Sequence, residues 1–539
     1  MTRRFLLLLC LALPAAVLPG AEGSSGALSG GIFRVSFQGS GLQAFDHVDP
    51  ALAYSRESWM LLDTVCAQLM RYRDRPPPAG YQLVPEVAAA PPTISNGGRT
   101  YTFKLRSGFR FNDGRPVRAD AFRQAIHRTM APGVDSPAWL YTQAIAGAAD
   151  VRAGRSARAT GVSARGLTLT VRFTRPVGDF AAWTTMPFLC AVPPNLPPSR
   201  EGVRTFPAAG PYVIRDYRRN QRVTLRRNAH YGGTRAHHVD GFDIDLSANS
   251  PEEILDRIEA GKADWGYTLP HPALRSGRGF ISKYSINHAR FWVTPGLTTA
   301  MFVLNSARPL FKDNPELRRA VNLALVRDAF VSNPAAFKPT DQLLPPGVAG
   351  FTDRKIYPLE GDLARAKALA AGDLRGGKMR LYVPDYPLAL GCAQCVQDRL
   401  EEIGLEVEIQ PFAEWTTASS YLGRLGDPNE PWDMALVLWS PDFVDPFGYV
   451  NRLLDRQASG GTDLAGFDEP PYLDRMRRAS RLQGTVRRRA YAELDFALAQ
   501  DAAPLVPIYV LNETTLVSAR ASCLLLRPAL VLTTVCLKR

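Results

Sequence analysis

Two aspartates, Asp442 and Asp445, follow an apolar run that ends at Trp439 and are well suited to chemistry. A carboxylate at the end of a strand can bind an ammonium group through charge-assisted hydrogen bonds, each worth ~1.5–3 kcal/mol. Two carboxylates that flank a glycosidic bond can also hydrolyse it. A structural interpretation is equally open, because aspartates in proline-rich turns commonly accept hydrogen bonds from nearby backbone N–H groups. The short spacing places both aspartates on one turn, which disfavours a catalytic pair that faces across a cleft.

Other catalytic signatures are missing from the sequence. There is no G-x-S-x-G elbow, no H-E-x-x-H helix and no phosphate-binding G-x-x-x-x-G-K-S/T loop. The adjacent His237 and His238 are typical of a solvated loop, because neighbouring side chains in a loop usually point apart. We therefore expect a protein that is not an enzyme, with no catalytic residues, no metal ligands and no cofactor.

The first residues have the pattern of an export signal. Arg3 and Arg4 precede the apolar stretch 5–18, which is shorter than the ~18–20 residues that span a bilayer, and small residues follow up to Gly23. We expect 1–23 to be a cleaved signal peptide and the protein to be exported, to a periplasm or a cell surface.

Export changes the interpretation of the cysteines, because disulfides form in oxidising compartments. Apart from Cys10 in the signal, an even number of cysteines remains, and sequence alone leaves many pairings open. Proximity favours pairing Cys392 with Cys395 and Cys523 with Cys536, which leaves Cys66 for Cys190. The spacing of Cys392 and Cys395 also resembles half a zinc site, but no second C-x-x-C or nearby histidine completes it.

The formal net charge of +13 raises the possibility of an anionic partner. The densest basic segments are 215–227 and 475–489, and the second reads as a helix with a solvated basic face. Acidic residues flank the basic run, with Asp474 before it and Glu493 after it. We therefore expect no nucleic-acid partner, and the charge favours residence near an anionic envelope.

Alternating elements must position the aspartates. With 539 residues the chain has room for several domains of about 150 residues. Period-2 alternation predicts strands over 101–106 and 167–173, and helical spacing predicts a helix over 119–130 that Asp120 opens. Further helices are predicted over 315–331 and 392–403, with a strand over 405–409. The apolar run 433–439 predicts a strand buried on both faces, within an α/β lobe from about 290 to 505.

Several blocks of the sequence match one family. They are 82–86 (QLVPE), 95–106 (SNGGRTYTFKLR), 108–114 (GFRFNDG), 209–214 (AGPYVI), 225–231 (LRRNAHY), 258–264 (IEAGKAD), 305–327 and 439–446 (WSPDFVDP). In this order they resemble the extracellular solute-binding proteins of family 5, the peptide- and nickel-binding receptors of ABC importers.

The resemblance implies an α/β, two-lobed, periplasmic-binding-protein-like fold (type II) with an extra variable subdomain. Carried onto this sequence, lobe I comprises 31–59, 198–289 and 506–539. The subdomain comprises 60–197, and lobe II comprises 290–505. On this map a Cys66–Cys190 disulfide ties the two ends of the subdomain together, and a Cys523–Cys536 disulfide staples the end of the chain.

The resemblance also implies a function and a site. The chain is expected to capture peptides in the cleft between its lobes, as a monomer, and to deliver them to the permease subunits of an ABC transporter. Asp442 is expected to pair with the ligand's α-ammonium group. Trp439 forms a flat wall, Ser440 and Phe443 flank the ligand, and Tyr54 faces it from lobe I.

One departure from the family leaves the ligand open. Dipeptide-binding relatives carry an arginine before a helix of the second lobe, which binds the ligand carboxylate, but the stretch 383–390 contains none. Longer peptides, a nickel chelate or another cationic small molecule therefore stay possible. A secreted hydrolase that uses Asp442 and Asp445 is the remote alternative.

Overall fold

The computed structural model describes residues 27–40, 44–268, 279–331, 333–413, 421–458 and 461–538. The expected signal peptide 1–23, with Cys10, lies outside these ranges. Within them, no helix is both long and apolar enough to cross a membrane.

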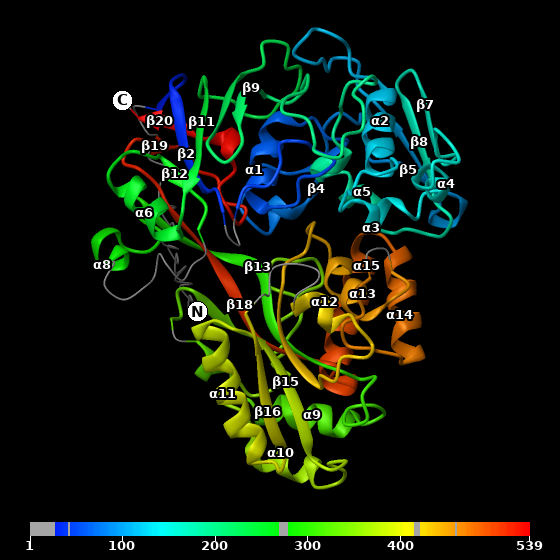
Figure 1. Cartoon of the computed structure of the whole chain (residues 1–539), viewed down its shortest axis with the longest axis vertical. Coiled ribbons are helices and arrows are strands. Elements are labelled where there is room, and N and C mark those ends of the chain that lie inside the picture. Colours follow the sequence, from blue (N-terminus) through cyan, green and yellow to red (C-terminus); the bar gives the residue numbers. More distant parts are fainter. Residues whose placement is uncertain are drawn as a thin grey trace, which may run out of the picture.

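Lobe I is built on a five-stranded sheet (Figure 1). In spatial order its strands are β12 (Trp265–Gly266), β2 (Ile32–Gln38), β11 (Gly241–Ala248), β10 (Arg222–Arg227) and β9 (Tyr212–Arg218). Alternation along β2 buries Phe33, Val35 and Phe37 in the core of this lobe. Helices α1 (Arg56–Val65) and α6 (Pro251–Glu259) pack on the sheet. The remaining elements of lobe I are α8 (Phe280–Tyr284), η7 (Leu532–Thr534) and a small sheet of β1 (Ala27–Leu28), β20 (Cys536–Lys538) and β19 (Ala521–Ser522).

The subdomain lies beside lobe I and contains an antiparallel four-stranded sheet. Its strands are β5 (Thr93–Ser95), β6 (Thr100–Lys104), β8 (Thr168–Arg172) and β7 (Val162–Arg165), and α2 (Ala119–Thr129) packs against them. Shorter elements complete it: β3 (Met70–Tyr72), β4 (Leu83–Pro85), η1 (Ala79–Tyr81), η2 (Asn96–Gly98), α3 (Trp139–Thr142), α4 (Ala148–Arg152), α5 (Phe180–Trp183) and η3 (Pro187–Leu189).

Lobe II is built on a six-stranded mixed sheet. Its strands, in spatial order, are β14 (Phe337–Pro339), β18 (Leu505–Leu516), β13 (Phe291–Leu304), β17 (Met434–Trp439), β15 (Lys378–Pro384) and β16 (Glu406–Phe412). Its helical elements are α9 (Pro315–Ala324), η4 (Arg327–Phe330), α10 (Leu363–Ala370), α11 (Pro387–Glu401), α12 (Tyr421–Leu425), η5 (Pro446–Gly448), α13 (Val450–Leu454), α14 (Pro470–Arg481), α15 (Gly484–Ala497) and η6 (Leu498–Ala502).

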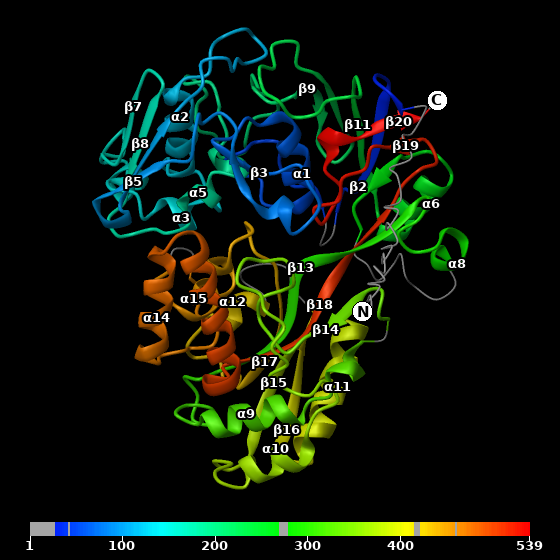
Figure 2. The ribbon, with the colours of Figure 1, turned by 180° about the vertical axis from the view of Figure 1, so that it is seen from behind.

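Two long antiparallel strands join the two lobes: β13 runs from lobe I into lobe II, and β18 returns in the opposite direction (Figures 1 and 2). Seen from behind, α14 and α15 lie directly against the subdomain (Figure 2). Gly178 shows how tight this seam is, because a Cβ atom there would lie 1.3 Å from the Ser480 carbonyl oxygen. One hydrophobic cluster also runs across the seam and includes Tyr141 and Phe443.

The elements predicted from periodicity are present, with shifted ends. Strands β6, β8 and β17 and helix α2 lie where the sequence predicts them, although Arg118 rather than Asp120 is the N-cap of α2. Helix α9 ends at Ala324, short of the predicted 331. Helix α11 begins at Pro387, before the predicted 392, because proline fits the first turn of a helix.

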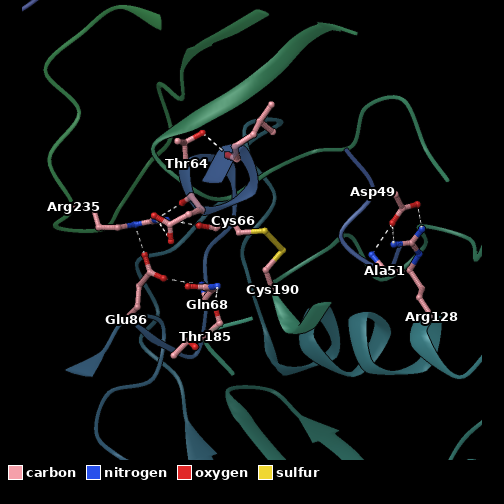
Figure 3. Close-up of a disulfide and its surroundings, with 12 residues drawn as sticks. Asp49, Ala51, Thr64, Cys66, Gln68, Glu86, Arg128, Thr185, Cys190 and Arg235 are labelled. Carbon is pink, nitrogen blue, oxygen red and sulfur yellow. Dashed lines mark hydrogen bonds and ion pairs between the residues drawn. A yellow bond between two sulfur atoms is a disulfide. The ribbon is translucent and has the colours of Figure 1, made fainter. Parts of the chain in front are cut away.

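Two of the three expected disulfides are confirmed. Cys66 and Cys190 form a disulfide with a Cα–Cα distance of 5.5 Å (Figure 3). Cys523 and Cys536 form a second one with a Cα–Cα distance of 5.2 Å. Close to the first bond the buried Arg235 contacts Glu86 at 2.8 Å and donates to the Cys66 carbonyl oxygen.

The expected Cys392–Cys395 disulfide is wrong, because both thiols are free. The two cysteines lie three residues apart inside α11, where Cβ atoms are about 5–6 Å apart, whereas a disulfide needs about 3.5–4.5 Å. Burial raises the pKa of the Cys392 thiol to about 12, so it packs as a small apolar side chain. Proximity in sequence misled the prediction because it ignored the geometry of the helix.

Candidate functional site

The candidate residues of lobe II lie at and just after the end of strand β17. Its register places Trp439, the last residue of the strand, opposite Thr299 of β13. Pro441 lies two residues beyond the end of the strand. The Trp439 indole N–H donates to the Gly448 carbonyl oxygen at 2.8 Å, and the Ser440 hydroxyl lies 2.6 Å from the Thr298 hydroxyl. These contacts hold the segment after the strand in one conformation.

Asp442 is the point where the three parts of the molecule meet. Its carboxylate accepts a hydrogen bond from Tyr54 of lobe I at 3.1 Å and another from Tyr141, on α3 of the subdomain. Arg452, on α13 of lobe II, forms an ion pair with it at 2.6 Å. The side chains of Asp442 and Arg452 are only 12% and 5% exposed. The structure thus brings Tyr54 to Asp442, and it adds two partners that the sequence analysis did not identify.

The guanidinium of Arg452 is held firmly in place. It lies over the rings of Trp439 and Tyr141, at 5.4 and 5.3 Å from their centroids, and donates to the Tyr141 hydroxyl at 2.6 Å. Burial opposes its charge, but the Asp442 carboxylate outweighs that effect and raises the pKa of Arg452 further. Burial, with Asp442 nearby, also raises the pKa of Tyr141, which stays a neutral donor. The cluster therefore contains a charged, mutually neutralising Asp–Arg pair.

A cavity of about 220 Å³ opens between the lobes beside Asp442. Its apolar lining includes Trp59 from α1, Leu297 from β13, Phe443 and Leu530. The Phe443 side chain is buried, with its ring 6.0 Å from that of Tyr141, and it serves as both core and cavity wall. Residues of both lobes line this space.

Asp445 has a structural role. Its carboxylate accepts from the Phe447 backbone N–H at 2.9 Å, which caps η5, and it is ion-paired with Arg487. The turn-capping interpretation is therefore the right one for Asp445. Asp442 and Asp445 each have an arginine of their own rather than facing a shared space, which gives no support to a hydrolytic pair.

Two larger hollows lie away from the lobe interface. One of about 650 Å³ sits on lobe I, lined by charged side chains that pair with one another, such as Arg222 with Asp243 and Arg257 with Asp245. Another of about 640 Å³ lies on lobe II near β14. Neither is lined by a residue that the sequence analysis expected at the ligand site, and size alone is no evidence of function.

Two buried carboxyl groups near the site have strongly shifted pKa values. Burial raises the pKa of Glu57 on α1 to about 8 and that of Asp179 to about 7. One oxygen of Asp179 accepts from the Trp183 indole N–H at 2.7 Å. Its other oxygen has no hydrogen-bond partner among the residues that the structure describes. Asp179 therefore keeps its proton to a higher pH in the folded protein than an exposed aspartate does.

No metal centre is found in the described part of the chain, where histidine, cysteine and carboxylate residues do not gather in groups of three or more. The ring of His237, from the adjacent histidine pair, instead lies 2.9 Å from the Arg235 carbonyl oxygen through Nδ1.

Sequence reasoning missed Tyr141 and Arg452. A signal for Arg452 is present, because it interrupts the apolar stretch 449–454, and an arginine on a buried helix needs a partner. No comparable signal exists for Tyr141, since it reaches Asp442 across 301 sequence positions.

Comparison with known proteins is consistent with this architecture. The model of the bacterial extracellular solute-binding proteins, family 5 (middle region), matches residues 82–461. The oligopeptide-binding protein OppA of Bacillus subtilis is 24% identical, with 78% of each chain covered. The periplasmic murein peptide-binding protein MppA of Escherichia coli is 25% identical, with 79% of this chain and 80% of that one covered.

Solved structures agree over nearly the whole length. The clavulanic acid biosynthesis oligopeptide binding protein 2 superposes with a TM-score of 0.83 at 23% identity, covering 95% of this chain and 96% of that one. The unliganded open form of MppA gives a TM-score of 0.76 at 21% identity, covering 96% and 99%. The fold is therefore the two-lobed, type II periplasmic-binding-protein fold that the sequence predicts.

Proposed function

Because the chain belongs to the bacterial extracellular solute-binding proteins of family 5, we propose that it is the substrate-binding receptor of an ABC importer. It captures peptides between its lobes and passes them unaltered to the permease in the membrane. The names of its relatives, which include oligopeptide- and murein peptide-binding proteins, support this choice. The observation that carries the proposal is the position of Asp442, where lobe I, the subdomain and lobe II meet.

The ligand in this proposal occupies the cavity beside Asp442. Phe443 forms part of the apolar lining of this cavity. Around it, Trp439 packs on Arg452, Ser440 fixes the adjoining backbone, and Tyr54 closes over the ligand from lobe I. Bound ligand then contacts both lobes at once, and it stabilises the closed form by as much as those contacts differ from the open form. Strands β13 and β18 are the two connections about which the lobes move.

Further parts of the proposal follow from the family. The protein is exported after removal of 1–23, acts in a periplasm or at a cell surface, and works as a monomer that binds without turnover. The lobe and subdomain boundaries are those expected from the sequence, except that α1 belongs to lobe I through Val65 and β18 belongs to the sheet of lobe II. A nickel chelate or other cationic small molecule is less favoured, because several relatives are named as peptide-binding proteins and Asp442 already has a cationic partner.

Native mass spectrometry of the purified protein tests the proposal directly. We expect complexes whose added masses, once released and fragmented, are those of peptides from the expression host. Asp442→Ala is expected to lower the retained fraction, and Asp150→Ala, at an exposed ion pair in the subdomain, serves as its matched control. A purified protein that stays free of ligand and binds no added peptide pool contradicts the proposal.

A further inference from the structure

The cation that pairs with Asp442 is Arg452, which belongs to the same lobe. Asp442 and Arg452 both belong to lobe II and lie ten residues apart in sequence, with their side chains in contact at 2.6 Å. Their contact therefore does not depend on closure of the lobes. Tyr54 and Tyr141, by contrast, come from lobe I and the subdomain, and their hydroxyls join the cluster only where the parts meet.

The contacts of Arg452 favour its pairing with Asp442 over pairing of Asp442 with the ammonium group of a ligand. Its guanidinium lies over Trp439 and Tyr141, and the backbone N–H of Thr462 donates to its carbonyl oxygen at 2.7 Å. An ammonium group that displaced it would leave a buried guanidinium without its carboxylate, which is costly in a dry interior. The neighbouring pair also has the advantage of being intramolecular, because no association entropy opposes it.

Resting on the peptide-binding function above, we propose that Arg452 takes the place of a ligand's α-ammonium at Asp442. The receptor therefore selects peptides whose N-terminal nitrogen is acylated and uncharged. An arriving peptide meets a carboxylate that is already neutralised, so a free α-ammonium has to be desolvated without a partner. The cavity beside Asp442 suits an acyl group, since Trp59, Leu297, Phe443 and Leu530 provide apolar wall.

A competition between two peptide pools tests the inference on the wild-type protein. The pools are tripeptide libraries of identical composition, one with free N-terminal amines and one N-acetylated, mixed in equal amounts with the receptor. Bound peptides are recovered and counted by mass spectrometry. We expect the acetylated peptides to be enriched about tenfold or more, the equivalent of one charge-assisted hydrogen bond.

The other outcomes separate this inference from the proposed function. Equal capture of both pools, or preference for free amines, overturns the role of Arg452 while peptide binding stands. Capture of neither pool contradicts peptide binding itself.

Variants provide the control. Arg452→Met releases Asp442 and is expected to reverse the preference towards free amines by about tenfold. Arg487→Met, which breaks the similarly buried pair with Asp445, is expected to leave the preference as in wild type. Asp442→Asn keeps the size of the side chain and is expected to keep the wild-type preference for N-acetylated peptides. A selective loss of free-amine binding in Asp442→Asn overturns the inference even where Arg452→Met does not fold.

Discussion

A buried ion pair between Asp49 and Arg128 links lobe I to the subdomain (Figure 3). We expect that breaking it lowers the free energy of unfolding substantially. The two guanidinium nitrogens donate to the two carboxylate oxygens at 2.8 and 2.6 Å, and the side chains are 0% and 2% exposed. Asp49 also accepts from the backbone N–H groups of Ala51 and Val203, each at 2.9 Å. Arg128→Met leaves the buried carboxylate with those backbone donors alone. We expect the free energy of unfolding to fall by about 3–5 kcal/mol.

Urea unfolding followed by circular dichroism measures this loss. Arg155→Met is the matched control, because Arg155 pairs with Asp150 in the same subdomain but the two side chains are 65% and 53% exposed. Exposed pairs contribute about 0–1 kcal/mol, so the control is expected to unfold close to wild type. A loss in Arg128→Met no greater than that in Arg155→Met refutes the reasoning.

Three further predictions concern the cysteines and a buried acid. Replacing Cys66 and Cys190 by serine opens a loop with a sequence separation of 124 and is expected to cost about 5 kcal/mol in thermal or urea unfolding. Thiol titration of the denatured protein lacking residues 1–23 is expected to find the free thiols of Cys392 and Cys395, and finding none would restore a third disulfide. Folded Asp179 holds its proton up to about pH 7, whereas the unfolded carboxyl releases it near its usual pKa of 3.8. Rising pH across that window therefore favours unfolding, and Asp179→Asn is expected to lose less stability than wild type between about pH 4 and 7. An identical pH dependence in both proteins counts against a raised pKa.

Local pattern predicted much of the fold. The run 434–439 is apolar throughout, and its first four residues are buried because β17 lies between β13 and β15. This burial is recognisable from the sequence. Helix ends were less accurate. Helix α9 begins at Pro315, as predicted, but it ends at Ala324 rather than 331, and α11 begins at Pro387 rather than 392. Periodicity alone does not mark where a helix begins or ends. The lobe arrangement came from the family resemblance, because pairings between distant strands leave no local signal.

The candidate site was predictable only in part. Trp439 was identifiable because it ends a predicted strand. The family resemblance suggested the roles of Asp442 and Tyr54. Arg452 was hidden by a general rule that takes basic side chains as solvated, although it interrupts an apolar stretch. Tyr141 reaches Asp442 only through the packing of the subdomain against lobe II, and that is a property of the folded chain.

A crystal structure of the protein with a captured peptide tests the central claim most directly. The account predicts peptide density between the lobes, next to Phe443 and Tyr54, with Arg452 still paired to Asp442. Peptide bound on an outer face, away from the space between β13 and α1, would contradict it.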